Sequence, residues 1–210
     1  MTSKFPKLLI LAAAVTSSVS CGDFVRQGRA PVILVVRSLQ AASGADPTEF
    51  GGTLASEVIT LRTSPDPCTD TSPCPTVFAD PASAVFAIQL KDQGSLGVIN
   101  EPSLTNQVTI DRYRVEYRRA DGHNTQGVDV PFAWDSAFTI TVPPDEDAVA
   151  GFQIVRQSAK SEAPLRALIQ SGNIISTIAV VTFYGHDQAG NQVSASANIG
   201  IDFADFADPD

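Results

Sequence analysis

The chain has 210 residues, of which 43% are hydrophobic and 18% are charged, and its formal net charge is −9. This composition supplies enough apolar side chains for a core and excludes an intrinsically disordered protein. The acidic balance also argues against nucleic-acid binding, because phosphates would repel such a chain.

The first twenty residues have the layout of a secretory signal peptide. Lys4 and Lys7 make the start positive, residues 8–15 ("LLILAAAV") are all apolar, and residues 16–18 are small and polar. The apolar run is too short to cross about 30 Å of hydrocarbon as a helix. We therefore predict that residues 1–20 form a signal helix that is cleaved on export. The loss of Lys4 and Lys7 would change the formal charge from −9 to −11.

Cys21 stands directly after this segment. Val19, Ser20 and Cys21 resemble the lipobox of bacterial lipoproteins, in which the cysteine becomes the lipidated N-terminus. Ser18 departs from the pattern, because that family usually has an aliphatic residue there. The alternative is ordinary secretory cleavage after the small-x-small run 18–20, which would leave a free thiol at the N-terminus. The resemblance implies a bacterial cell-envelope protein, lipid-anchored at Cys21 on the periplasmic side or outer surface, with residues 21–30 as a tether.

The two remaining cysteines lie in a proline-rich loop over residues 64–82. Cys68 and Cys74 are six residues apart in "PCTDTSPC". In an oxidising envelope such a pair forms a local disulfide, and we predict one here. A redox or metal pair is the alternative, but there is no C-x-x-C spacing and no neighbouring histidine.

Most of the chain reads as short strands separated by turns. The strands are predicted over residues 32–36, 56–62, 82–91, 108–119, 138–142, 149–155, 178–184 and 193–203. The first is a continuous aliphatic run, which indicates a strand that is buried on both faces or wedged between sheets.

The strand over residues 108–119 alternates most regularly. Its apolar face carries Tyr113, Val115 and Tyr117, and its other face carries Arg112, Arg114, Glu116 and Arg118. This pattern predicts a half-buried strand with a charged solvent face. Cross-strand ion pairing is favoured there over an anion-binding patch.

One segment has helical spacing. In "SEAPLRALIQSG", over residues 161–172, Leu165, Leu168 and Ile169 fall at i, i+3 and i+4. Ser161 would cap this helix and Gly172 would end it. We expect a short helix that bridges two strands.

The last hairpin, over residues 176–203, contains a "DQAGN" turn in which Gly190 can adopt a positive φ. It resembles the final hairpin of immunoglobulin-like and fibronectin-type-III-like domains of bacterial surface proteins, which often carry a D-x-A-G-N turn. A looser resemblance over residues 112–203 is to the water-stress domain of late-embryogenesis-abundant proteins. Both imply an all-β fold, a two-sheet immunoglobulin-like sandwich with one short connecting helix. We place the sandwich at residues 31–204 and an acidic tail at 205–210. The first hundred residues either decorate this domain or form a partial second one.

Signals for catalysis are few. His123 and His186 both stand in turns, and the chain has no H-E-x-x-H, G-x-S-x-G, P-loop or G-x-G-x-x-G motif. We therefore predict no catalytic residue, no metal ligand and no cofactor.

Trp134, close behind Phe132, is the candidate ligand contact. Core packing is favoured for Trp134, and an exposed Trp that anchors a carbohydrate or protein is the alternative. The sequence thus predicts a non-enzymatic cell-envelope lipoprotein whose sandwich binds an envelope protein or has a structural role. The alternative is a secreted or anchored module for carbohydrate or another small ligand.

Overall fold

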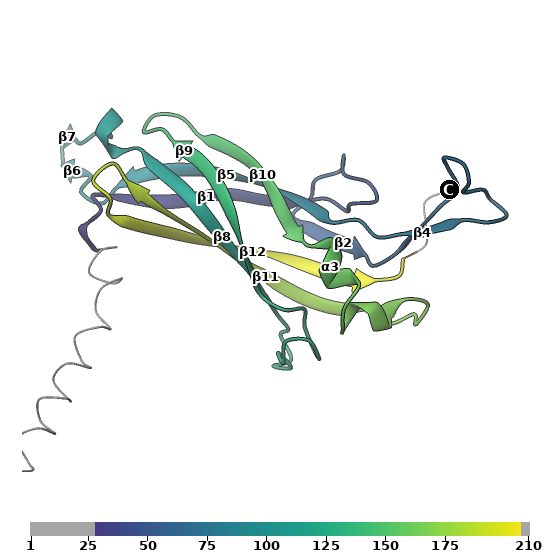
Figure 1. The fold of residues 1–210 in the computed structure, drawn as a ribbon. Coiled ribbons are helices and arrows are strands. Elements are labelled where there is room, and N and C mark those ends of the chain that lie inside the picture. Colours follow the sequence, from purple (N-terminus) through teal and green to yellow (C-terminus); the bar gives the residue numbers. More distant parts are fainter. Residues whose placement is uncertain (1–27, 207–210) are drawn as a thin grey trace, which may run out of the picture.

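Two β-sheets packed face to face make up most of the molecule (Figure 1). The computed structural model describes residues 28–206, so the predicted signal helix, Cys21 and most of the tether lie outside the described residues. The smaller sheet has the order β1-β5-β10, and the larger has the order β2-β12-β11-β8-β9. Each pairing in the two sheets is antiparallel except β12 with β2. The predicted all-β sandwich is confirmed.

The strands of the two main sheets have five to thirteen residues. They are β1 (Val32–Ala41), β2 (Thr53–Glu57), β5 (Asp80–Leu90), β8 (Val108–Arg118), β9 (Trp134–Val142), β10 (Ala148–Val155), β11 (Ile175–Asp187) and β12 (Gln192–Ala204). Two small ribbons extend from them, β3 (Thr60–Arg62) with β4 (Cys74–Thr76) and β6 (Gly94–Ser95) with β7 (Val98–Ile99).

Aromatic rings join the two sheets at the centre of the core. Phe86 of β5 and Phe152 of β10 meet Phe183 of β11 edge to face, with ring centroids 4.7 and 5.3 Å apart. Tyr113 of β8 lies against Phe152 at 4.9 Å. These contacts come from the inward positions of each strand, as the period of two requires.

The alternation predicted for residues 108–119 is confirmed, since Tyr113, Val115 and Tyr117 are all buried. The prediction that residues 32–36 are buried on both faces is wrong, because Ile33 is 46% exposed. β1 is an edge strand of the smaller sheet, and only one of its faces packs on the core. A continuous aliphatic run does not distinguish these two placements.

The single strand predicted over residues 56–62 is in fact two strands that belong to different sheets. β2 pairs in parallel with β12, whereas β3 pairs with β4. Val58 lies between them, fully buried, and its N–H donates to the carbonyl of Ala204. The strand pairing with β12 therefore ends before Val58, but this hydrogen bond still attaches Val58 to the large sheet.

The helix predicted over residues 161–172 is wrong in extent and type, because that range holds only a 3-10 turn, Leu165–Leu168 (η2). A short α-helix, Gln157–Lys160 (α3), precedes the predicted range. Ser161 is the C-cap of α3 rather than an N-cap. Pro164 cannot donate a backbone hydrogen bond and so separates the two turns. Leu165 and Leu168 are buried as their spacing predicted.

The predicted disulfide is confirmed. Cys68 and Cys74 are bonded, with Cα atoms 5.3 Å apart, and the surrounding loop is mostly exposed. The loop is less irregular than predicted, because it contains β4, which begins at Cys74.

The start of the acidic tail is held to the domain. Both carboxylate oxygens of Glu57 accept the backbone N–H of Phe206, and Asp205 accepts the N–H of Gln170. The first two residues of the predicted tail, Asp205 and Phe206, are therefore held against the sandwich.

The turn between β11 and β12 forms as predicted. Gly190 has a φ of 78°. The carboxylate of Asp187 accepts backbone N–H groups of Ala189 and Asn191, at 2.9 and 2.8 Å. Asp187 thus stabilises its own turn, as side chains of this type do.

Candidate functional site

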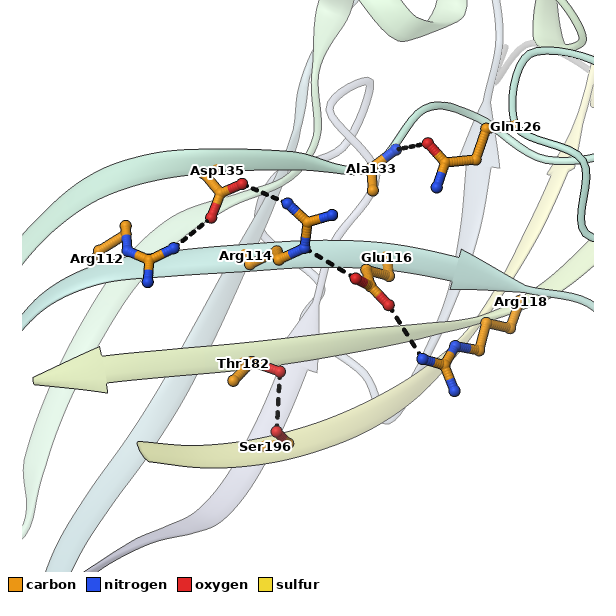
Figure 2. Close-up of polar contacts among 9 residues, drawn as sticks. All are labelled: Arg112, Arg114, Glu116, Arg118, Gln126, Ala133, Asp135, Thr182 and Ser196. Atoms are coloured by element: carbon orange, nitrogen blue, oxygen red, sulfur yellow. Dashed lines mark hydrogen bonds and ion pairs between the residues drawn. The ribbon is translucent and has the colours of Figure 1, made fainter. Parts of the chain in front are cut away.

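The outer surface of the five-stranded sheet carries an ordered row of polar side chains. We call it the polar sheet face and define it by Arg112, Arg114, Glu116, Arg118, Asp135, Thr182 and Ser196 (Figure 2). The strand period places these side chains outward, because their neighbours Tyr113, Val115 and Tyr117 point into the core.

Three arginines and two carboxylates of this face form a continuous chain of ion pairs. Asp135 of β9 bridges Arg112, at 2.6 Å, and Arg114. Glu116 then joins Arg114, at 2.8 Å, to Arg118, at 3.0 Å (Figure 2). The row has one positive charge in excess on a chain whose formal charge is −9. The predicted cross-strand pairing is confirmed, since Asp135 comes from the neighbouring strand.

The pairing changes the acidity of its members. Hydrogen bonds from Arg114 and Arg118 lower the pKa of Glu116, and hydrogen bonds to Glu116 and Asp135 raise the pKa of Arg114. Both charges are therefore held through the neutral pH range. Each side chain is about one-third exposed, so solvent screens the pair.

Strand register continues the row across the sheet. Arg114 is aligned with Asp135 on one side and with Thr182 on the other, and Thr182 is aligned with Ser196. The hydroxyl groups of Thr182 and Ser196 are 2.9 Å apart. A partner would thus meet charged groups over β8 and β9 and small hydroxyl groups over β11 and β12 (Figure 2).

A cavity of about 390 Å³ lies at the end of this face, between β8 and the β11–β12 hairpin. It is lined by Asp111, Arg112, Tyr184, Gly185, His186, Gln192 and Val193. The guanidinium of Arg112 stands 3.9 Å from the centre of the Tyr184 ring. Nδ1 of His186 is 3.3 Å from a carboxylate oxygen of Asp111. These groups offer hydrogen-bond donors, acceptors and an aromatic face in one recess.

A β-bulge shapes the cavity. The register of β8 shifts against β9 between Ile110 and Arg112, and the register of β11 shifts between Tyr184 and Gly185. Asp111 and Arg112 are consequently both exposed, although they are neighbours on one strand. A Cβ at Gly185 would stand 2.3 Å from the Thr109 carbonyl oxygen, so this bulge requires glycine.

Trp134 lies elsewhere. It is the first residue of β9, is 8% exposed, and donates from Nε1 to the Tyr117 hydroxyl at 3.4 Å. Its ring lies edge to face with Tyr113. This placement is the core packing that was favoured, and the buried ring leaves no face for a ligand. Phe132, 48% exposed, packs over Gly127 and is not part of the cavity.

A buried ion pair lies at the end of the sandwich opposite the cavity. Lys160 and Asp80 form an ion pair of 2.7 Å, and their side chains are 1% and 0% exposed. Asp80 also accepts hydrogen bonds from the Ser56 hydroxyl and the Gly44 N–H, at 2.6 and 2.8 Å. Burial raises the pKa of Asp80 and lowers the pKa of Lys160. The pair fixes α3 to the start of β5 and does not open onto the polar sheet face.

Sequence reasoning identified the charged residues of β8 but not the cavity. No local pattern marks Asp111, Tyr184 or Gln192, and the prediction that His186 stands in a turn is wrong, because it lies in β11. The available signal was Gly185, a glycine inside a strand, which commonly marks a bulge or a close backbone approach.

Within residues 28–206, no helix is long and apolar enough to cross a membrane. The same residues contain no group of three or more His, Cys, Asp or Glu side chains placed to hold a metal ion. Comparison with known protein families and with curated proteins finds no family and no relative that matches this chain.

Proposed function

We propose that this protein is a non-enzymatic lipoprotein of the bacterial cell envelope that binds an envelope protein through its polar sheet face. The anchor part of the proposal rests on the leader over residues 1–20 and on Cys21. The binding part rests on the ion-paired row from Arg112 to Arg118. Five charged groups already aligned by their own contacts require little ordering when a complementary surface arrives.

Intact mass of the protein from its membrane fraction tests the anchor. We expect a chain beginning at Cys21 that carries several acyl chains and lacks two hydrogens for the Cys68–Cys74 bond. Cys21→Ser should move the folded protein to the soluble fraction, because stable anchoring needs two or more chains. An unlipidated mass, or membrane retention of the variant, would refute this part.

Site-specific photo-crosslinking tests the binding surface. A photo-reactive side chain at Thr182 should capture an envelope protein, and Arg114→Glu should abolish that product by reversing the charge at the centre of the row. Arg37→Glu is the matched control, because Arg37 is an exposed, ion-paired arginine on the other sheet. Capture that is unchanged by Arg114→Glu would contradict the assignment of this face.

A second function, binding of a carbohydrate or another small polar ligand, is favoured by the cavity beside Arg112 and Tyr184. The Tyr184 ring and the polar groups of Asp111, His186 and Gln192 are the kinds that contact sugar rings and hydroxyl groups. A glycan array with the wild-type protein and with Tyr184→Ala distinguishes this function. Binding that Tyr184→Ala removes would favour the ligand-binding function, and absence of binding to any glycan would leave the protein-binding proposal.

A further inference from the structure

The most exposed large apolar side chains of the described residues lie in one short segment. Leu96, Ile99, Leu104 and Val98 are 107%, 78%, 74% and 70% exposed, more than any other large apolar residue described. We call these four residues the apolar tip. Exposed apolar groups that gather in one place commonly mark a contact with a partner or a membrane.

The local backbone holds this tip away from the core. β6 and β7 form a hairpin joined by residues 96 and 97, and Gly97 supplies the positive φ of 92° that the turn needs. Leu96 therefore stands at the end of the hairpin with nothing over it. Leu104 opens the 3-10 turn η1 (Leu104–Asn106), which begins five residues after the last residue of β7.

The segment is also almost free of charge. Residues 93–110 contain a single charged residue, Glu101, whereas 18% of the whole chain is charged. The acidity of the protein is therefore carried elsewhere, and the tip can approach a lipid surface with little electrostatic cost.

The tip lies at the end of the sandwich where the described chain begins (Figure 1). β1 and β5 are antiparallel, and Val32 is aligned with Leu90. The Lys91 N–H donates to the Pro31 carbonyl, and Lys91 Nζ lies 3.5 Å from the Gly28 carbonyl oxygen. β6 starts three residues after Lys91, so the hairpin leaves the sandwich beside the entry of the tether.

The length of the tether limits how far this end can stand from a membrane. Cys21 precedes Gly28 by seven residues, which span at most about 25 Å when fully extended. We propose that the apolar tip inserts into the acyl-chain boundary of the bilayer that holds the anchor. This inference rests on the proposed lipid anchor at Cys21. The anchor and the tip together would fix the orientation of the sandwich relative to the bilayer.

Fluorescence quenching by brominated lipid tests this. The lipidated, full-length protein would be reconstituted in phosphatidylcholine vesicles with bromine on the acyl chains, either unsubstituted or as Leu96→Trp or Val128→Trp. Val128 is the matched control, because it is 67% exposed and follows β8, whereas Leu96 lies in the segment that precedes that strand. The eleven residues of β8 span about 35 Å. Buried Trp134 contributes the same background to each sample.

We expect Leu96→Trp to lose most of its added fluorescence to the bromines, and Val128→Trp to lose none. If neither variant is quenched although intact mass shows the acyl chains, the tip stays in water and the inference fails while the anchor stands. If the mass shows no acyl chains, the proposed anchor fails and the inference fails with it. If Leu96→Trp shifts to the blue without vesicles, in step with dimer formation, a second copy covers the tip and the lipid assignment is wrong.

Discussion

Lys160 and Asp80 come from positions eighty residues apart and meet in a site without water access. A charge buried in this way is tolerable only while its partner is present, because removal of one member leaves the other desolvated and unpaired. The Ser56 hydroxyl and Gly44 N–H add two more donors to Asp80. The ion pair therefore determines where α3 sits against the smaller sheet.

Lys160→Ala should lower the free energy of unfolding by about 3–5 kcal/mol, because it leaves the Asp80 carboxylate buried without its cation. Urea denaturation followed by Trp134 fluorescence measures this. Arg37→Ala is the control, since it breaks an ion pair with Asp147 whose members are 58% and 40% exposed. That change should cost less than about 1 kcal/mol. Similar losses for the two variants would contradict the assigned role.

Glu116 gives a pH-dependent contribution with a definite sign. Hydrogen bonds from Arg114 and Arg118 lower its pKa in the folded protein. Its contribution is therefore present above the pKa of the unfolded chain and is lost as the pH falls through the lowered folded value. In Glu116→Gln, the free energy of unfolding should change less between pH 7 and acid pH than in the wild type. Because the side chain is partly exposed, the difference should stay below about 1 kcal/mol. A steeper acid dependence in the variant would refute this.

At the scale of elements, the bulge where β8 pairs with β11 interrupts the regular register, and the residues around it line the cavity. Gly185→Ala places a Cβ against the backbone at Thr109 and Ile110, at 2.3 and 2.8 Å. Backbone atoms cannot move aside as a flexible side chain can, so we expect a loss of about 1–3 kcal/mol and a displaced Asp111. Urea denaturation and backbone amide shifts of β8 measure both effects. Gly200→Ala is the control, because its nearest contact would be an ordinary 3.7 Å to the Thr53 side chain.

The disulfide belongs to the same scale. Cys68 and Cys74 close a short loop outside the two main sheets, and the stabilisation from loop closure is small for so few residues. Replacement of both by serine should cost about 2 kcal/mol at most and leave the sandwich folded. Thermal unfolding with and without a reductant measures this, and the reductant should not affect the double variant. Loss of the folded state in the double variant would contradict a local role.

At the scale of the whole molecule, residues 28–100 are not separable from the rest of the described chain. β1 and β5 make up the smaller sheet with β10, and β2 is the edge strand beside β12. Phe86 of β5 packs directly on Phe183 of β11. Neither half of the chain buries a core without the other.

We therefore expect one cooperative unfolding transition. Hydrogen exchange at increasing urea concentration should release the amides of β5 together with those of β11, because they lose protection only when the whole sandwich unfolds. Exchange of β5 at clearly lower urea would indicate a separate, weaker unit. The amides of the disulfide loop supply the comparison, since they should exchange without urea.

The sequence by itself determined the features that depend on neighbouring residues. The alternation of Tyr113, Val115 and Tyr117 with charged residues predicted the half-buried strand, because the period of two is a property of the extended backbone. The turn at Gly190 and the Cys68–Cys74 bond were equally local. The leader and Cys21 remain predictions from sequence.

Only the tertiary structure decided which strands meet. The aliphatic run of β1 does not predict that this strand lies at the edge of its sheet. The sequence of residues 56–62 does not predict that β2 and β3 join different sheets. The pairing of Lys160 with Asp80, and the bulge that brings Asp111 and Arg112 beside His186 and Tyr184, depend on strands distant in the chain. Such pairings are selected by the joint burial of both sheets, which no short stretch of sequence contains.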